Sequence, residues 1–141
     1  MSTSIVNETF YPYPADNVWR ALTDPAALGE WLMPNDFKPE IGHKFTFRTD
    51  PAPPYFDGIA HCEVVELDPP CVLAYSWRGG PLPNTKVRWL LTPSEGGTLL
   101  RLEHSGFDLG DPGQRAAFSR LAGGWGGKII IRFTAVLEGM A

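Results

Sequence analysis

Cysteine is scarce in this sequence, and its histidines are scattered. The two cysteines, Cys62 and Cys71, have the spacing neither of a disulfide framework nor of a Cys-x-x-Cys metal or redox pair. We therefore expect two reduced, partly buried thiols. The three histidines, His43, His61 and His104, do not cluster with other ligand-type residues. The sequence therefore predicts no metal site.

Basic runs and long apolar runs are also missing. The net formal charge is −4, and Lys and Arg are not clustered, so we expect no nucleic-acid partner. Every apolar stretch falls far short of the ~20 residues that span a bilayer, so we expect no membrane insertion. The first seven residues lack the cationic start and apolar segment of a signal peptide. These features predict a cytoplasmic protein.

No motif for nucleophilic catalysis or phosphate binding occurs. Ser76 and Ser105 lie outside any Gly-x-Ser-x-Gly context. The glycine pairs at 79–80 and 96–97 are too short to form a phosphate loop and are typical of turns. We therefore expect no cofactor, and the sequence identifies no catalytic residue.

Aromatic residues, glycine and proline are plentiful instead. The chain has 141 residues, which suits a single domain over residues 1–141. Five Trp, eight Phe and four Tyr supply large apolar side chains, while 15 Gly and 14 Pro imply many turns. This mixture is typical of a fold with many strands and few helices.

The hydrophobic periodicity predicts an α+β fold. Residues 15–22 and the segment after Asp24-Pro25 have the pattern of short helices, the second ending at Pro34. From Pro112, apolar residues recur at three- and four-residue intervals and predict one long closing helix, with a first half bent by glycines at 123, 124, 126 and 127. Strands between the helices must pair antiparallel, because parallel pairs need crossover helices. The predicted strands span residues 4–11, 44–48, 59–67, 72–77, 86–91 and 99–104.

An ordered set of short motifs resembles a known family. The set comprises Phe10 to Pro14, Val18 to Pro25, Leu28 with Trp31 and Pro34, Ile41-Gly42, Gly58, Glu66 to Pro70, Tyr75-Ser76-Trp77 and Gly124-Trp125. It resembles the family named for the C-terminal domain of the activator of Hsp90 ATPase, within the START-like helix-grip superfamily. The resemblance implies a curved antiparallel sheet of about six strands, two short helices after the first strand, and a long C-terminal helix over a cavity. In relatives this cavity holds lipids, polyketides or other apolar molecules.

Inward-facing aromatic and polar residues are the candidates for lining such a cavity. Each of them also fits an ordinary core position, since aromatic side chains fill cores routinely. His104 stands out because strand alternation places it inside with Leu100 and Leu102, and Tyr75 is its expected partner across the sheet. The candidates are Trp31, Phe47, Phe56, Cys62, Tyr75, Trp77, Trp89, Leu102, His104, Trp125 and Ile129.

Three functions remain open at this point. The first is a non-catalytic domain that binds a lipid-like, polyketide-like or aromatic molecule in its cavity. The second is an enzyme of cyclase or dehydratase type, with His104 and Tyr75 as acid and base. The third is a co-chaperone-like interaction module, drawn from the family name alone. The chain ends where the domain ends, so we do not expect an Hsp90-type partner, whereas a homodimer is compatible with exposed sheet edges.

Overall fold

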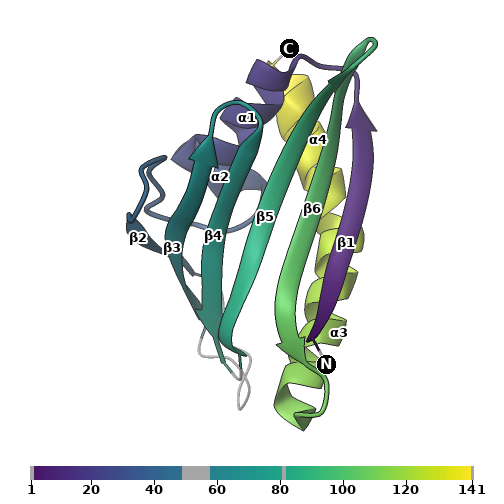
Figure 1. Cartoon of the computed structure of the whole chain (residues 1–141). Helices are drawn as coiled ribbons and strands as arrows, with labels where there is room; N and C mark the ends of the chain where they lie inside the picture. The colour runs from purple at the N-terminus through teal and green to yellow at the C-terminus, as the bar shows by residue number, and fades with distance from the viewer. Residues whose placement is uncertain (1, 49–57, 81, 141) are drawn as a thin grey trace.

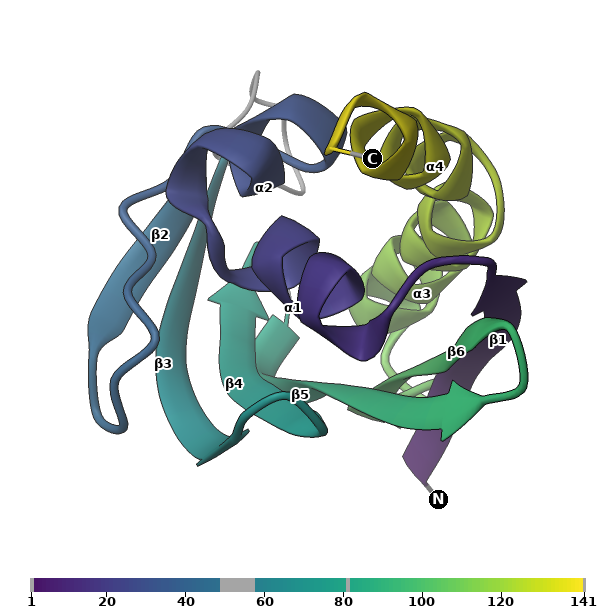
Figure 2. The same cartoon turned by 90° about the horizontal axis from the view of Figure 1, so that it is seen from above.

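The computed structural model describes residues 2–48, 58–80 and 82–140 and shows one antiparallel sheet gripping a set of helices. The elements follow in the order β1 (Ser2–Tyr11), α1 (Ala15–Thr23), α2 (Pro25–Trp31), β2 (Lys44–Arg48), β3 (Ile59–Asp68), β4 (Val72–Gly79), β5 (Leu82–Ser94), β6 (Gly97–Asp108), α3 (Pro112–Gly126) and α4 (Lys128–Met140). The sheet curves around the helices, which lie against its inner face (Figures 1 and 2). The predicted helix-grip architecture is confirmed.

The strand order is β1-β6-β5-β4-β3-β2, and all pairs are antiparallel. Strands β2 to β6 therefore form a meander, while β1 joins it beside the last strand and forms one edge. Alternation along the strands buries one face and exposes the other. In β6, for example, Leu100, Leu102 and His104 are buried, and Arg101 and Glu103 are not.

The two short helices form where the sequence predicts them. Helix α1 buries Val18, Ala21 and Leu22 on one face. Asp24 caps α2, because its Oδ2 accepts a hydrogen bond from the Ala27 amide at 3.2 Å, and Pro25 occupies the first helical position. Both helices pack against α4.

The closing helix is divided into two segments. We expected one long helix with a bend, but the helix is interrupted at Gly127, between α3 and α4. Glycine weakens a helix by up to ~1 kcal/mol relative to alanine, and the chain has four glycines within residues 123–127. The predicted apolar stripe is nevertheless confirmed, since Trp125 and Phe133 are buried and the other members pack against the core: Phe118, Leu121, Ile129 and Val136. No helix among the described residues is long and apolar enough to cross a membrane.

Candidate functional site

The inner face of the β5–β6 hairpin forms the floor of the site. Val87 stands opposite His104, Trp89 opposite Leu102 and Leu91 opposite Leu100, and all six side chains are buried. This is the inward row that strand alternation predicts. The long hairpin strands thus present aromatic, aliphatic and imidazole groups to the helices that cover them.

Trp31 of α2 and Trp125 of α3 pack on Trp89 of this floor. The rings of Trp31 and Trp89 meet edge to face at 5.7 Å between centroids, and those of Trp89 and Trp125 do the same at 5.7 Å. Phe133 of α4 packs against Trp31 at 5.0 Å. Edge-to-face contacts of this kind stabilise by about 0.5–1.5 kcal/mol each beyond the area they bury. The three tryptophans therefore form a packed aromatic wall.

A small cavity lies between this wall, β1 and α4. Its volume is about 20 Å³, which is enough for about one water molecule. Its lining includes Asn7 and Thr9 of β1 and Ile129 and Ile130 of α4, and because all four are only half-buried, the cavity extends toward the surface between β1 and α4. The complete lining is Asn7, Thr9, Tyr11, Trp31, Trp89, Leu100, Leu102, Trp125, Ile129, Ile130 and Phe133.

The indole N–H groups of the aromatic wall are all satisfied within the protein. Trp31 Nε1 donates to the Ala21 carbonyl at 2.8 Å, and Trp89 Nε1 donates to the Tyr75 hydroxyl at 3.1 Å. Within the described part of the chain, no buried side-chain nitrogen or oxygen lacks a hydrogen-bond partner. The wall therefore offers the cavity ring surfaces and no unpaired donors, which suits an apolar occupant.

His104 forms the centre of a buried hydrogen-bond relay. Trp125 Nε1 donates to His104 Nδ1 at 3.1 Å, and His104 Nε2 lies 2.8 Å from the Thr85 hydroxyl, which itself donates to the Trp77 carbonyl at 2.7 Å. An indole can only donate, so Nδ1 must be the acceptor and the imidazole proton sits on Nε2. The neutral ring is thus fully satisfied, and burial lowers the pKa of His104 from 6.5 to about 3.

Tyr75 is not the partner of His104 that strand pairing suggested. Val87 stands between them in the sheet, pairing with Tyr75 on one side and His104 on the other. Each of the two is hydrogen-bonded to a different tryptophan, and burial raises the pKa of Tyr75, which keeps its phenol protonated. Neither residue lines the cavity. The acid and base pair of the cyclase hypothesis is therefore not assembled in this structure.

The predicted site residues divide into two groups. Those that line the cavity are Trp31, Trp89, Leu102, Trp125 and Ile129. Those that fill the core away from it are Phe47, Cys62, Tyr75, Trp77 and His104, whose rings and side chains occupy the space under the helices that we expected to be open. Phe56 lies outside the described residues. Burial also raises the pKa of the Cys62 thiol, which keeps it protonated.

Sequence reasoning missed the β1 side of the cavity. Asn7, Thr9 and Tyr11 share the inward parity of buried Ile5, so alternation along the first strand contained the signal. Polar Asn and Thr at inward positions weaken this signal, because they interrupt the apolar alternation. Phe133 belonged to the predicted helical stripe, and Thr85 has the same parity as Val87.

No group of three or more His, Cys, Asp or Glu side chains in the described ranges is placed to hold a metal ion. The arrangement as a whole is an aromatic cavity with satisfied polar groups. Its chemistry suits binding by shape and apolar contact.

Sequence comparison places the chain in a family. Residues 12–138 match the family described as Activator of Hsp90 ATPase homolog 1-like protein. The chain belongs to this family. No curated protein matches it.

Solved structures of the helix-grip fold are similar to this member of the activator of Hsp90 ATPase homolog 1-like family. MLL2253 from Mesorhizobium loti is 35% identical, with a TM-score of 0.85 and 99% of each chain covered. BH1534 from Bacillus halodurans is 26% identical, with a TM-score of 0.77 and 96% of each chain covered. DynU16, a protein of the dynemicin biosynthetic locus, is 27% identical with a TM-score of 0.76, and the match covers 96% of this chain and 47% of DynU16.

Proposed function

We propose that this protein binds a small apolar molecule of aromatic character between β1, the β5–β6 hairpin and α4. The observation that carries the proposal is the cavity walled by Trp31, Trp89 and Trp125, which leads toward the surface between β1 and α4. Ring faces without unpaired donors bind flat apolar molecules by dispersion and the hydrophobic effect. The Thr9 hydroxyl donates to Asn7 Oδ1 at 3.0 Å, which leaves the NH₂ group of Asn7 to donate to a polar substituent of the ligand.

The cavity must widen to admit such a ligand. Its volume is about 20 Å³, whereas a cavity that binds benzene measures ~150 Å³. The helix interruption at Gly127 lies two residues after Trp125 and one residue before α4. Because Gly127 lies between Trp125 and Ile129, a pivot at this point lets α4 with Ile129 move relative to the Trp125 ring and widen the cavity. We therefore interpret the structure as the closed state.

The similar structures support this class of ligand. DynU16 belongs to the locus for dynemicin biosynthesis, and it shares this fold at 27% identity. A binding domain for the intermediates of a natural product needs an apolar, shape-selective cavity. The aromatic wall of this protein meets that requirement.

Ligand occupancy tests the proposal directly. Native mass spectrometry of the purified protein is expected to show a small molecule bound at one per chain. Flat aromatic compounds such as anthracene carboxylates are expected to raise the thermal unfolding midpoint, because they bind the native state only. They are also expected to quench the tryptophan fluorescence, since three tryptophans form the wall. No adduct, no quenching and no shift across the panel would contradict the proposal.

A substitution at the outer end of the cavity locates the site. Thr9→Trp is expected to abolish quenching and the thermal shift, because the indole occupies the path between β1 and α4. Val6→Trp is the matched control, since Val6 lies on the same strand with its side chain 50% exposed on the opposite face. Equal ligand binding by both variants would place the ligand elsewhere.

A further inference from the structure

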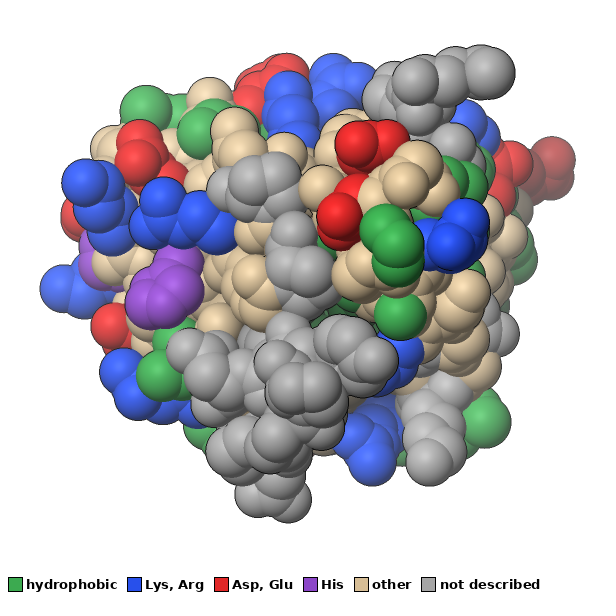
Figure 3. Space-filling model, turned by 90° about the horizontal axis from the view of Figure 1, so that it is seen from below, with side chains coloured by type: hydrophobic (Ala, Val, Ile, Leu, Met, Phe, Trp, Pro, Cys, Tyr) green, Lys and Arg blue, Asp and Glu red, His purple; other side chains and the backbone are tan. Residues whose placement is uncertain are grey.

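A second hollow lies on the other face of the sheet. It has a volume of about 640 Å³ and crosses the outer sides of β2, β3 and β4. Side chains directed away from the core form much of it, including Lys44, His61, Glu63 and Arg78. In Figure 3, histidine side chains lie next to basic side chains at the left of the view, the side on which Figure 1 shows β2 and β3. This outer groove is separated from the aromatic cavity by the sheet itself.

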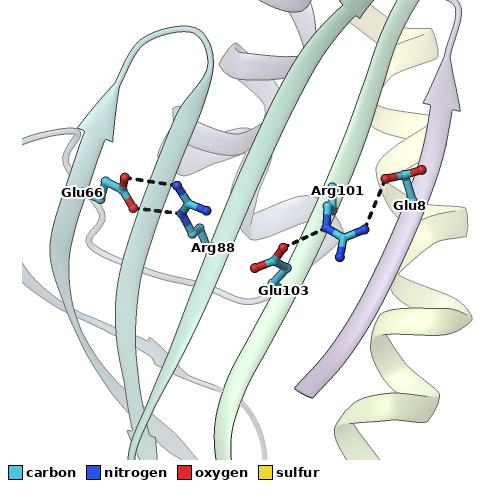
Figure 4. Close-up of polar contacts among 5 residues, drawn as sticks. All are labelled: Glu8, Glu66, Arg88, Arg101 and Glu103. Carbon is cyan, nitrogen blue, oxygen red and sulfur yellow. Dashed lines mark hydrogen bonds and ion pairs between the residues drawn. The ribbon is translucent and has the colours of Figure 1, made fainter. Parts of the chain in front are cut away.

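Two other arginines on this face, Arg88 and Arg101, are neutralised by carboxylates (Figure 4). Arg88 is bound by both oxygens of Glu66, at 3.0 and 3.3 Å. Arg101 is bound by Glu103 at 2.8 Å and by Glu8 at 3.4 Å. These contacts raise the pKa of both arginines and lower that of Glu66. The charges of Arg88 and Arg101 are therefore balanced by carboxylates of the same face.

The cations of the groove have no such partners. Within residues 2–48, 58–80 and 82–140, neither Arg78 nor Lys44 forms an ion pair. Arg78 stands directly opposite His61 in the β3–β4 register, so their backbones lie ~4.8 Å apart and both side chains point to the same side. A guanidinium and an imidazole next to each other form a row of N–H donors.

The two carboxylates of the groove face donors of their own. Asp36 accepts hydrogen bonds from the Thr46 amide at 2.8 Å and from its hydroxyl at 3.5 Å. Glu63 stands opposite Lys44 in the β2–β3 register, where opposite charges attract across strands. Arg78, by contrast, stands opposite His61 and forms no ion pair with a carboxylate of the described residues.

We propose that the outer groove binds the carboxylate or phosphate group of a small organic anion. Arg78 supplies the planar pair of N–H donors that both anions accept, and the His61 ring supplies a further donor on the neighbouring strand. Lys44 adds an attractive charge on β2. The volume of the groove leaves room for the remainder of a metabolite-sized ligand.

Amide chemical shifts test this proposal. The ¹⁵N-labelled protein is titrated with inorganic phosphate and, separately, with acetate, with sodium chloride holding the ionic strength constant. At least one anion is expected to shift the amides of His61 and Arg78 along a saturable curve. Saturation by phosphate alone identifies a phosphate ester as the ligand class, and saturation by acetate alone identifies a carboxylate. If neither anion saturates, the proposal is wrong.

Paired arginine variants provide the control. Arg78→Gln is expected to raise the dissociation constant of the saturating anion about tenfold, because it removes the bidentate donor. Arg88→Gln removes one positive charge from the same face at a position outside the groove, and it is expected to change the dissociation constant by less than about twofold. Lys44→Gln is a second test within the groove and is expected to weaken binding about threefold. Equal weakening by Arg78→Gln and Arg88→Gln would show nonspecific charge attraction and overturn the site.

Discussion

His104 shows how a buried histidine makes the stability of this protein depend on pH. In the unfolded chain a histidine titrates near pH 6.5, whereas burial lowers the pKa of His104 in the fold to about 3. Above pH 6.5 the His104 imidazole is neutral in both the folded and the unfolded state, and the relay contributes its full stability. Between pH 6.5 and 3 the unfolded state takes up a proton that the folded state does not. The free energy of unfolding should therefore fall by up to ~1.4 kcal/mol per pH unit on this account.

Denaturant unfolding at several pH values measures this effect. His104→Gln is expected to lower stability at pH 7.5, because Trp125 and Thr85 lose a partner of the right geometry. It should also flatten the decline of stability between pH 6.5 and 4.5. His61→Gln changes an exposed histidine on the outer face and should keep the wild-type slope. If the free energy of unfolding declined with pH equally in wild type and His104→Gln, His104 would not be a buried neutral imidazole.

At the residue scale, the sequence predicted which side chains point inward but not what they contact. Alternation placed Trp89, Leu102 and His104 inside correctly. Whether an inward side chain lines a cavity or fills the core depends on the depth at which helices pack over it. Trp77 and Trp125 show this, since both are buried and their rings lie 6.0 Å apart, but only Trp125 reaches the cavity. Distances of this kind are set by tertiary packing, which local patterns do not contain.

At the scale of elements, the divided closing helix is the feature most open to engineering. Gly123 lies in α3, and a Cβ added there meets no atom within 4 Å. Gly123→Ala is therefore expected to raise the free energy of unfolding by ~0.5–1 kcal/mol, since alanine has the higher helix propensity. If the glycines permit the closing helix to move, the same change should slow the association of an aromatic ligand.

Stopped-flow fluorescence separates the two effects. Gly139→Ala is the matched control, because Gly139 lies near the end of α4 and its Cβ would also meet nothing within 4 Å. It should raise stability without altering the association rate. If Gly123→Ala leaves the ligand association rate at the wild-type value, the closing helix does not pivot at this segment.

The elements themselves were largely predictable, and their ends were not. The β5–β6 hairpin was expected over residues 86–91 and 99–104, yet β5 continues to Ser94 and β6 begins at Gly97. The intervening turn is only Glu95-Gly96, and Gly96 has a φ of +79°, which glycine adopts without strain. Proline at 93 suggested an earlier end to the strand, because proline lacks a backbone donor. Pro93 nevertheless pairs with Thr98, which keeps this end of β5 in register with β6.

At the scale of the whole molecule, the close approach of two distant segments completes the sheet. Gly97 lies against the chain at the end of β1, where an added Cβ would collide with the Tyr11 carbonyl and come within 2.9 Å of the Pro12 Cα. The Thr98 hydroxyl donates to the Tyr13 carbonyl at 2.8 Å in the same region. The hairpin turn and the β1–α1 connection are thus fitted to each other without space for a side chain.

Gly97→Ala is expected to destabilise the fold by at least ~3 kcal/mol, because β1 must separate from β6 to relieve the collision. The neighbouring Gly96 has open space around its Cβ position. Gly96→Ala should therefore lower the free energy of unfolding by only the ~1–2 kcal/mol that a positive φ costs alanine. Thermal or urea unfolding of both variants compares them. Equal losses would show that the close approach at Gly97 is relieved without moving β1.

The strand order was beyond the local sequence patterns. They predicted an antiparallel meander, and the family resemblance supplied the grip of the sheet around the closing helix. Neither gave the pairing of β1 with β6, because that contact joins residues about 90 positions apart and no local signal specifies it. The small volume of the aromatic cavity was equally unpredictable, since it results from how the tryptophan rings interlock.

The position of β1 also has a consequence for the synthesis of the chain. Among the described strands it pairs with β6 alone, so its buried residues, among them Ile5 and Tyr11, cannot reach their place in the sheet until β6 has been translated. At roughly 5–20 residues per second, this interval is on the order of 5–20 s. For that time the nascent chain carries an unpaired, partly hydrophobic segment, which is open to premature association with other chains.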